Sequence, residues 1–192
     1  MTDRAPWQLE PASAGVRAWL VGLTAVLPVV ITGVALGFAF MSDGPKSLIA
    51  NNAPLTVGVT LAGIALLGGA IAFVVDRAMR RHRITMDANG MELVTTFHRR
   101  RLGWAQLRLD DARVANLDEH TQLKPMFKSN GTAVPGFKSG WFRLRNREKA
   151  LVAMAGGPRI AWIPTTAGYG LLLQPRQPQA LLDHLREVAP RR

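Results

Sequence analysis

The sequence predicts a membrane-embedded helical hairpin followed by a mainly-β domain. Two windows, Ala18 to Met41 and Leu55 to Val75, hold 24 and 21 residues without one charged side chain or histidine. At about 1.5 Å per helical residue, each window is long enough to cross a hydrocarbon core of about 30 Å. Beyond Asp76, short alternating stretches separated by turn residues replace the continuous apolar pattern, which is typical of antiparallel sheets.

The two windows divide the chain into five parts. These are a cytoplasmic N-terminal segment (1–17), transmembrane helices over 18–41 and 55–75, an external loop (42–54) and a domain of residues 76–192. The first window is too long for a signal peptide and ends without a small-x-small cleavage site, so we expect it to be retained. Pro28 lies in its middle and predicts a kink. We expect the whole water-soluble core to come from residues after Asp76, because they alone reach domain size.

Basic residues at the ends of the spans predict the orientation. Arg4 and Arg17 precede the first span, only Lys46 lies in the connection, and the second span is followed by Arg77, Arg80, Arg81 and Arg83. Because basic flanks stay on the cytoplasmic side, we expect a multi-pass protein of the inner (plasma) membrane with both termini in the cytoplasm. The last four arginines are also candidates for contact with anionic lipid headgroups. A topology signal alone is the simpler interpretation.

Small residues recur at helix-contact spacing in both spans. The pairs are Gly33 with Gly37, and Ala65 with Gly69. Such spacing lets helix backbones approach closely. The sequence favours packing of the two spans on each other, and a homo-oligomer formed within the bilayer is the alternative.

The domain pattern predicts seven strands and a final helix. The first two strands, Ile84 to Ala88 and Met91 to His98, form a hairpin because Asn89-Gly90 supplies the positive-φ residues of a tight turn. The other strands are predicted at 112–117, 141–145, 149–155, 159–164 and 169–173. From Gln179 to Ala189, one helical stripe carries Leu181, Leu182, Leu185 and Val188. We therefore expect two small sheets closed by an amphipathic helix.

This order of elements is that of a pleckstrin-homology (PH)-like domain. The segments Val134 to Val152, with its Pro-Gly-x-x-x-Gly turn, and Ile163 to Leu182, with its Leu-x-Pro-x-x-Pro run, resemble the bacterial PH-like family in which two transmembrane helices precede the domain. The resemblance implies a seven-stranded antiparallel sandwich or partly open barrel with a C-terminal helix, and it implies no particular activity. Eukaryotic relatives bind inositol phosphates through basic residues around the first hairpin turn. Here that turn, Ala88 to Met91, has none.

No residue pattern predicts catalysis. The chain has no cysteine, and His82, His98, His120 and His184 are far apart and begin no metal-ligand spacing. The acidic pairs Asp110-Asp111 and Asp118-Glu119 are adjacent in sequence, so their side chains point to opposite faces of a strand. We predict that the protein is not an enzyme and has no cofactor and no metal.

A basic and aromatic segment is the best candidate for a partner surface. About 20 residues, His120 to Gly140, form a connection without predicted structure, and such long connections are commonly functional. Trp141, Arg143 and Arg145 then alternate onto the face opposite Phe142 and Leu144. The candidate partner-binding residues are Lys124, Phe127, Lys128, Phe137, Lys138, Trp141, Arg143 and Arg145. The alternative is an edge strand whose arginines discourage aggregation.

Together these patterns predict a membrane-anchored PH-like binding or assembly module without catalytic activity. Its partners would be the bilayer, a protein partner and anionic headgroups. The alternatives are an accessory subunit of a membrane enzyme or transporter complex, and a tethered nucleic-acid-binding domain that uses the net charge of +11. Anionic lipid explains that charge as simply as nucleic acid does. A transporter would need ionisable groups within its spans, and these spans have none.

Overall fold

The computed structural model describes residues 5–42 and 49–190 and divides into two compact units. One unit, here the helical unit, is Ala14–Arg77. The other, here the β unit, combines Met1–Ser13 with Ala78–Arg192. Arg4 and Lys46, which entered the topology argument, lie outside the described residues.

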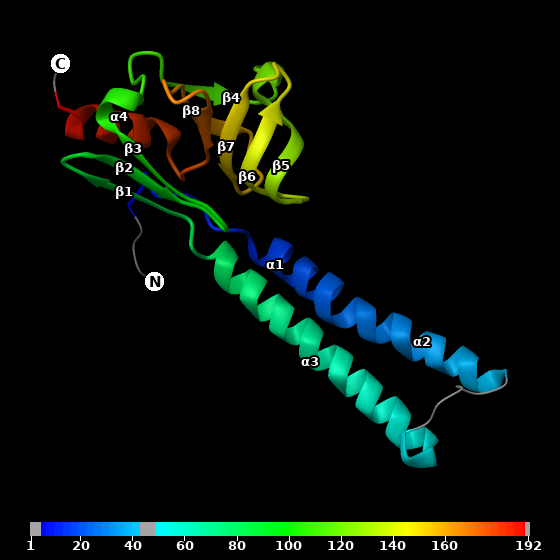
Figure 1. Cartoon of the computed structure of the whole chain (residues 1–192). Helices are drawn as coiled ribbons and strands as arrows, with labels where there is room; N and C mark the ends of the chain where they lie inside the picture. The colour runs from blue at the N-terminus through cyan, green and yellow to red at the C-terminus, as the bar shows by residue number, and fades with distance from the viewer. Residues whose placement is uncertain (1–4, 43–48, 191–192) are drawn as a thin grey trace. The chain divides into compact units, whose positions relative to one another are not determined.

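Two long apolar helices make up the helical unit, as the sequence predicts. The first is continuous from Ala14 to Met41 and consists of α1 (Ala14–Val21), the π-helical turn η1 (Gly22–Val26) and α2 (Leu27–Met41). The second is α3 (Ala53–Met79), which follows the short η2 (Ile49–Asn51). The two lie side by side (Figure 1). Both helices are long and apolar enough to cross a membrane.

The expected disturbance at Pro28 takes the form of a π-helical turn. Pro28 is the second residue of α2, which follows η1 directly, and its missing N–H cannot continue the regular ladder. The close approach of the two helices occurs nearby, since a Cβ on Gly68 would lie 2.5 Å from the carbonyl oxygen of Thr24. A Cβ on Gly33, Gly37 or Gly69 would have open space within 4 Å. The two long helices thus approach each other closely at Gly68 and not at the glycines of the predicted pairs.

The described residues of the β unit, 5–13 and 78–190, form two sheets and no closed barrel. The three-stranded sheet has the order β1-β2-β3, and the six-stranded sheet has the order β4-β8-β9-β7-β6-β5. Their bounds are β1 Arg83–Asp87, β2 Gly90–Val94, β3 Arg99–Gly103, β4 Arg113–Asn116, β5 Pro125–Val134, β6 Phe137–Leu144, β7 Lys149–Met154, β8 Arg159–Ile163 and β9 Gly170–Leu173. Neighbouring strands are antiparallel except β7 and β9, which run parallel. The prediction of seven antiparallel strands is therefore wrong in number and in one pairing.

The two strands that were not predicted are polar. β3 begins with three arginines and has no apolar alternation, and β5 occupies the connection that we expected to lack structure. The short η3 (Trp104–Gln106) follows β3, and η4 (Thr121–Leu123) precedes β5. In both strands, backbone pairing with a neighbour overrides the weak side-chain pattern. Gly131 and Gly140 pair across β5 and β6 with backbones so close that a Cβ on either would strike the other strand.

The central strands of the six-stranded sheet, β6 to β9, are buried on both faces. One face carries the cluster with Phe142, Val152 and Leu172. The other carries Leu151, Ile163 and Leu171, and it joins the inner face of the three-stranded sheet and the helix α4 (Pro178–Val188) in a second cluster. α4 packs against β8 and β4, and it buries the predicted leucines while Val188 stays partly exposed.

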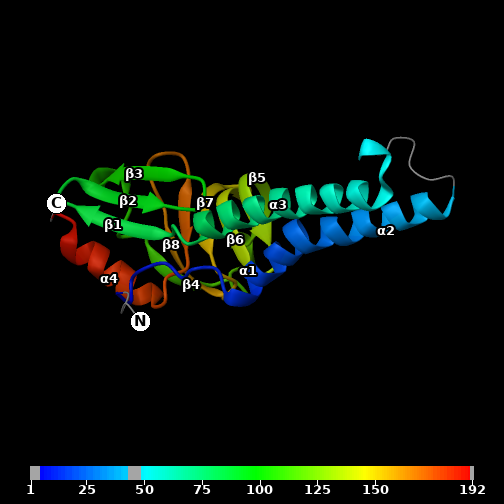
Figure 2. The same cartoon turned by 90° about the horizontal axis from the view of Figure 1, so that it is seen from below.

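The N-terminal segment belongs to the β unit, which corrects the prediction that the core begins after Asp76. Leu9 is 1% exposed and lies in the same cluster as β1 and α4. It forms an antiparallel bridge with Pro175, and the amide of Glu10 donates to the carbonyl of Gln174. Figure 2 shows this segment running beside α4. The core is therefore built from both ends of the sequence.

Candidate anion-binding pocket

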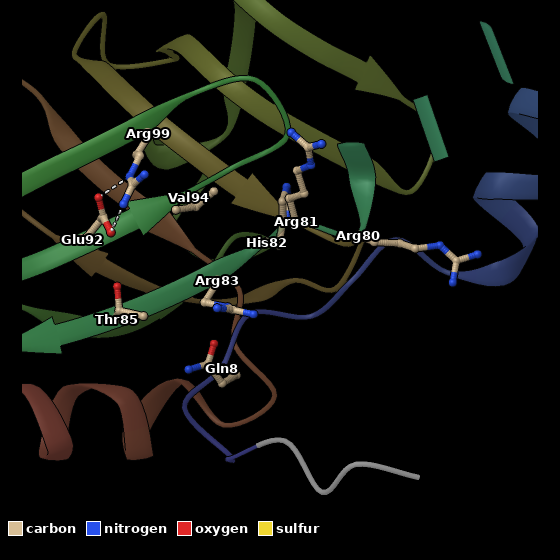
Figure 3. A pocket seen from close by; sticks show the side chains of 9 residues that line it. All are labelled: Gln8, Arg80, Arg81, His82, Arg83, Thr85, Glu92, Val94 and Arg99. Atoms are coloured by element: carbon tan, nitrogen blue, oxygen red, sulfur yellow. Dashed lines mark hydrogen bonds and ion pairs between the residues drawn. The ribbon is translucent and has the colours of Figure 1, made fainter. Parts of the chain in front are cut away.

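A basic pocket of about 460 Å³ lies on the outer face of the three-stranded sheet, where β1 begins and β2 ends. It is lined by Gln8, Arg80, Arg81, His82, Arg83, Thr85, Glu92, Val94 and Arg99. All of these residues belong to the β unit. Figure 3 shows that they come from the N-terminal segment, the residues before β1 and all three strands.

Strand register arranges the pocket in two rows. Arg83, Val94 and Arg99 lie opposite one another in the first row, and Thr85, Glu92 and Arg101 form the second. These side chains point outward, because Ile84, Leu93 and Leu102 occupy the alternate positions and are buried. In the first row, the apolar side chain of Val94 is thus flanked by Arg83 and Arg99.

The cations of the pocket differ in whether they have an acidic partner. Arg99 forms a two-pronged ion pair with Glu92, in which Nη2 lies 2.9 Å from Oε2. The hydrogen bonds from Arg99 hold the pKa of the Glu92 carboxyl below its usual range. For Arg81 and Arg83, the described part of the chain offers no acidic side chain within ion-pair distance. The pocket therefore contains guanidinium groups that are not neutralised.

His82 lies beneath the pocket and is buried, with 4% of its surface exposed. Its Nε2 is 3.1 Å from the hydroxyl of Thr96 and 3.0 Å from that of Ser139. Burial lowers the pKa of His82 to about 4, although the backbone of Glu10 favours the charged form. The ring is therefore neutral at physiological pH. It joins the start of β1 to β6 and adds no charge to the site.

Ser139 and His82 lie as close together as a catalytic nucleophile and its base, but they lack the access that a reaction needs. Ser139 is completely buried, and its Oγ also accepts the amide proton of Thr96 at 3.3 Å. A reacting hydroxyl must be reachable by substrate. The pair therefore acts as a structural connection between the two sheets.

Gln8 fixes the first residues of β1. Its Nε2 donates to the carbonyl of Ile84 at 2.9 Å, and its Oε1 accepts the amide proton of Ile84 at 3.3 Å. The side-chain amide thereby pairs with β1 as a neighbouring strand would. Because Ile84 follows Arg83 directly, this pairing positions the backbone of Arg83.

The predicted headgroup candidates separate in the structure. Arg80, Arg81 and Arg83 line the pocket, and all three are exposed. Figure 3 shows Arg80 extending away from Arg83 and Glu92. Arg77 ends the helical unit and does not line the pocket. Gln8, Glu92 and Arg99 were not among the candidates named from the sequence. Strand register brings them together, and no local motif signals it.

Part of the predicted partner surface is interior. Trp141 is 8% exposed and Phe137 is 1% exposed, which corrects the expectation that Trp141 faces outward. The Trp141 ring makes near-perpendicular contacts with the rings of His98 and Tyr169, and the ammonium group of Lys149 lies 4.6 Å from its centre. Its cationic neighbours are Lys149 and Arg100, which the sequence did not place there.

The remaining partner candidates stay at the surface, around the edge strand β5. Phe127 and Arg143 face each other across β5 and β6, and Phe127 is 71% exposed. Arg145 and Lys128 are exposed. Lys124 forms an ion pair with Asp118, and Lys138 donates to the carbonyl of Pro125. A smaller basic edge therefore replaces the surface centred on Trp141.

Each arginine of the run 99–101 also has a partner within the β unit. Arg99 binds Glu92, Arg100 lies 5.5 Å from the centre of the Trp141 ring, and Arg101 binds Asp87. The pKa of Asp87 is lowered, chiefly by the amide of Asn89 in the hairpin turn. This pattern accounts for three consecutive arginines in a strand.

Comparison of the chain with protein-family models, with curated proteins and with solved structures gives no match.

Proposed function

We propose that the chain is a membrane-anchored binding or assembly module that acts without catalysis. The observation that carries this proposal is the joining of two very different units in one chain. The helical unit exposes large apolar side chains, including Leu66 and Phe73, each more than 70% exposed. The β unit contains 21 basic and 11 acidic side chains. Exposed apolar surface on this scale is unfavourable in water and favours a bilayer.

The β unit contains segments from both ends of the chain, which supports placing both termini on the same side of the membrane. Residues of the N-terminal segment pack in the same core as the strands that follow α3. If both helices cross the bilayer, the segment and the domain must lie on one side of it. The basic residues around Arg81 favour the cytoplasmic side of an inner membrane.

The PH-like assignment is part of the proposal. Its support is the amphipathic helix α4 that follows the last strand and packs against β8 and β4, together with the residue segments that resemble the family. The nine strands and the parallel β7–β9 pair depart from the expected pattern. The proposed activity therefore rests on the anchor and the surfaces of the β unit.

The proposed protein-binding face is the β5–β6 edge around Phe127, Arg143 and Arg145. β5 has a neighbour on one side only, and its exposed Met126 and Phe127 lie beside basic residues. An edge strand offers backbone groups for pairing, and the arginines favour an acidic partner. The register shifts in β5 between Pro125 and Phe127 and between Lys128 and Asn130 limit how long such pairing can be.

A comparison of complexes from native membranes tests the proposal. One portion of the membranes would be washed with alkaline carbonate to test the anchor, and from unwashed membranes the full chain and a variant with Phe127→Ser and Arg143→Glu would be purified in a gentle detergent. We expect both chains to stay in the carbonate-washed membranes, and the variant alone to lose its co-purifying proteins from the unwashed ones. An Arg159→Glu variant, on the exposed start of β8, controls for charge. Release by carbonate would contradict the anchor, and unchanged partners would contradict the binding face.

A further inference from the structure

We propose that the basic pocket binds a phosphate group through Arg81, Arg83 and Arg99. The inference deepens the proposed function, since a membrane anchor makes a lipid headgroup one source of that phosphate. A soluble phosphate ester is the other source. The ligand chemistry is the same in both cases.

Spacing supports a ligand of this size. Arg83 and Arg99 lie in one row, with the strand of Val94 between them. Strand spacing of about 4.8 Å places their backbones about 10 Å apart. An arginine side chain reaches more than half of that distance. Because Nε and Nη2 of Arg99 bind Glu92, the Nη1 group of Arg99 is the donor that can meet the Arg83 guanidinium group at one tetrahedral anion above Val94.

Charge supports a doubly charged ligand. Four arginines line the pocket, of which Arg80 extends away from Arg83 and Glu92 (Figure 3). Arg81, Arg83 and Arg99 bring three positive charges, Glu92 brings one negative charge, and His82 is neutral. Apart from Arg80, the local excess of two positive charges matches a phosphate monoester, which carries about −1.5 to −2 at pH 7. Guanidinium groups also present paired N–H donors that fit phosphate oxygens.

The rest of the β unit explains why these arginines are distinctive. Arg101 and Arg100 on β3 are engaged by Asp87 and by the Trp141 ring. Arg81 and Arg83 have no such acidic partner among the described residues, and Gln8 and His82 hold the backbone on either side of Arg83. The scaffold is therefore fixed while the charges of Arg81 and Arg83 remain available, and Arg99 keeps Glu92 as its partner.

The position along the chain supports a headgroup as the source. Arg81 and Arg83 follow the last residue of α3, Met79, by two and four residues. Four extended residues span about 14 Å at most. If α3 crosses the bilayer, the pocket is within reach of the headgroup layer.

Calorimetric titration of the full chain in a neutral detergent tests the inference. The probes are a short-chain phosphatidic acid, glycerol 3-phosphate and, as a ligand without phosphate, a short-chain diacylglycerol. The test variant combines Arg81→Glu and Arg83→Glu, and the control combines the exposed Arg113→Glu and Arg159→Glu with the same change in net charge. An Arg83→Gln variant reports on the site if charge reversal disturbs folding.

We expect phosphatidic acid to bind the unaltered chain and the control, and to bind the test variant about tenfold more weakly or not at all. Glycerol 3-phosphate binding with the same pattern would identify a site open to soluble esters, and its absence would identify the headgroup as the source. Equal weakening in both double variants, binding of diacylglycerol alone, or no binding would overturn the proposal. None of those outcomes removes the chain from the membrane, so they leave the proposed anchor and partner face standing.

Discussion

His82 is a titratable side chain enclosed between the two sheets. Its Nε2 contacts the hydroxyls of Thr96 and Ser139, and burial holds the ring neutral. In the unfolded chain the same ring titrates near 6.5. Folding therefore excludes a proton that the unfolded chain accepts, and this makes the stability of the β unit depend on pH.

We expect the free energy of unfolding of the β unit to fall as the pH drops from about 6.5 towards 4. Because the folded-state pKa of His82 is about 4, its full contribution is present above pH 6.5. The loss reaches about 3 kcal/mol at pH 4. Urea unfolding of the full chain in detergent, followed by tryptophan fluorescence at several pH values, measures it. A His82→Gln variant should show a smaller decline over this range, and an equal decline would assign the effect to other groups, such as His98, whose pKa is also lowered.

The burial of Trp141 determines how much stability its substitution should cost. The ring is packed against His98, Tyr169 and Lys149, so Trp141→Ala should cost about 3–5 kcal/mol of stability by creating a cavity. The exposed neighbour Arg143 should be replaceable by Glu with a change below about 0.5 kcal/mol. Thermal unfolding of the two variants distinguishes these effects. Equal stability of both would mean that Trp141 is a surface residue after all.

At the scale of elements, the N-terminal segment acts as part of the β domain. Gln8 pairs with β1, and Glu10 accepts a hydrogen bond from the side chain of Gln174 at 2.7 Å. The Trp7 ring stacks on His184 of α4 with 4.9 Å between ring centres. These contacts connect the segment to the first strand, to the chain after the last strand and to the final helix.

We expect Leu9→Asp to destabilise the β unit by several kcal/mol, as Leu185→Asp in α4 should do, because both would bury an unpaired charge. Leu9 and Leu185 are 1% and 0% exposed in the same cluster. Matched exposed positions are Pro11 for the segment and Val188 for the helix. Chemical unfolding of the four Asp variants checks the comparison. A Leu9 variant as stable as the Pro11 variant would show that the segment is not part of the core.

At the scale of the whole molecule, the sequence predicted the elements with a strong apolar pattern. These include both long helices, the first hairpin and α4. It missed β3 and β5, because their charged and polar residues are stabilised by pairing with distant strands and leave no local signal. It missed the role of Leu9, since a single apolar residue in a short segment has no periodicity.

The candidate site was predictable only in part, for a similar reason. A run of arginines after an apolar span is visible in sequence, so Arg80, Arg81 and Arg83 could be named. Their grouping with Arg99 and Glu92 depends on strand register. For Trp141, alternation shows which residues share a face but not whether that face is covered, and here the sheet is covered on both faces.

The central claim is that one hairpin anchor carries a domain built from both ends of the chain. The absence of cysteine in the sequence allows clean single-cysteine variants, Pro11→Cys, Asn52→Cys and Arg159→Cys. A membrane-impermeant maleimide would be applied to spheroplasts and to inverted vesicles. We predict that the Pro11→Cys and Arg159→Cys variants react only in inverted vesicles and the Asn52→Cys variant only in spheroplasts. Reaction of the Pro11→Cys and Arg159→Cys variants from opposite sides, or of all three from the same side, would contradict the account.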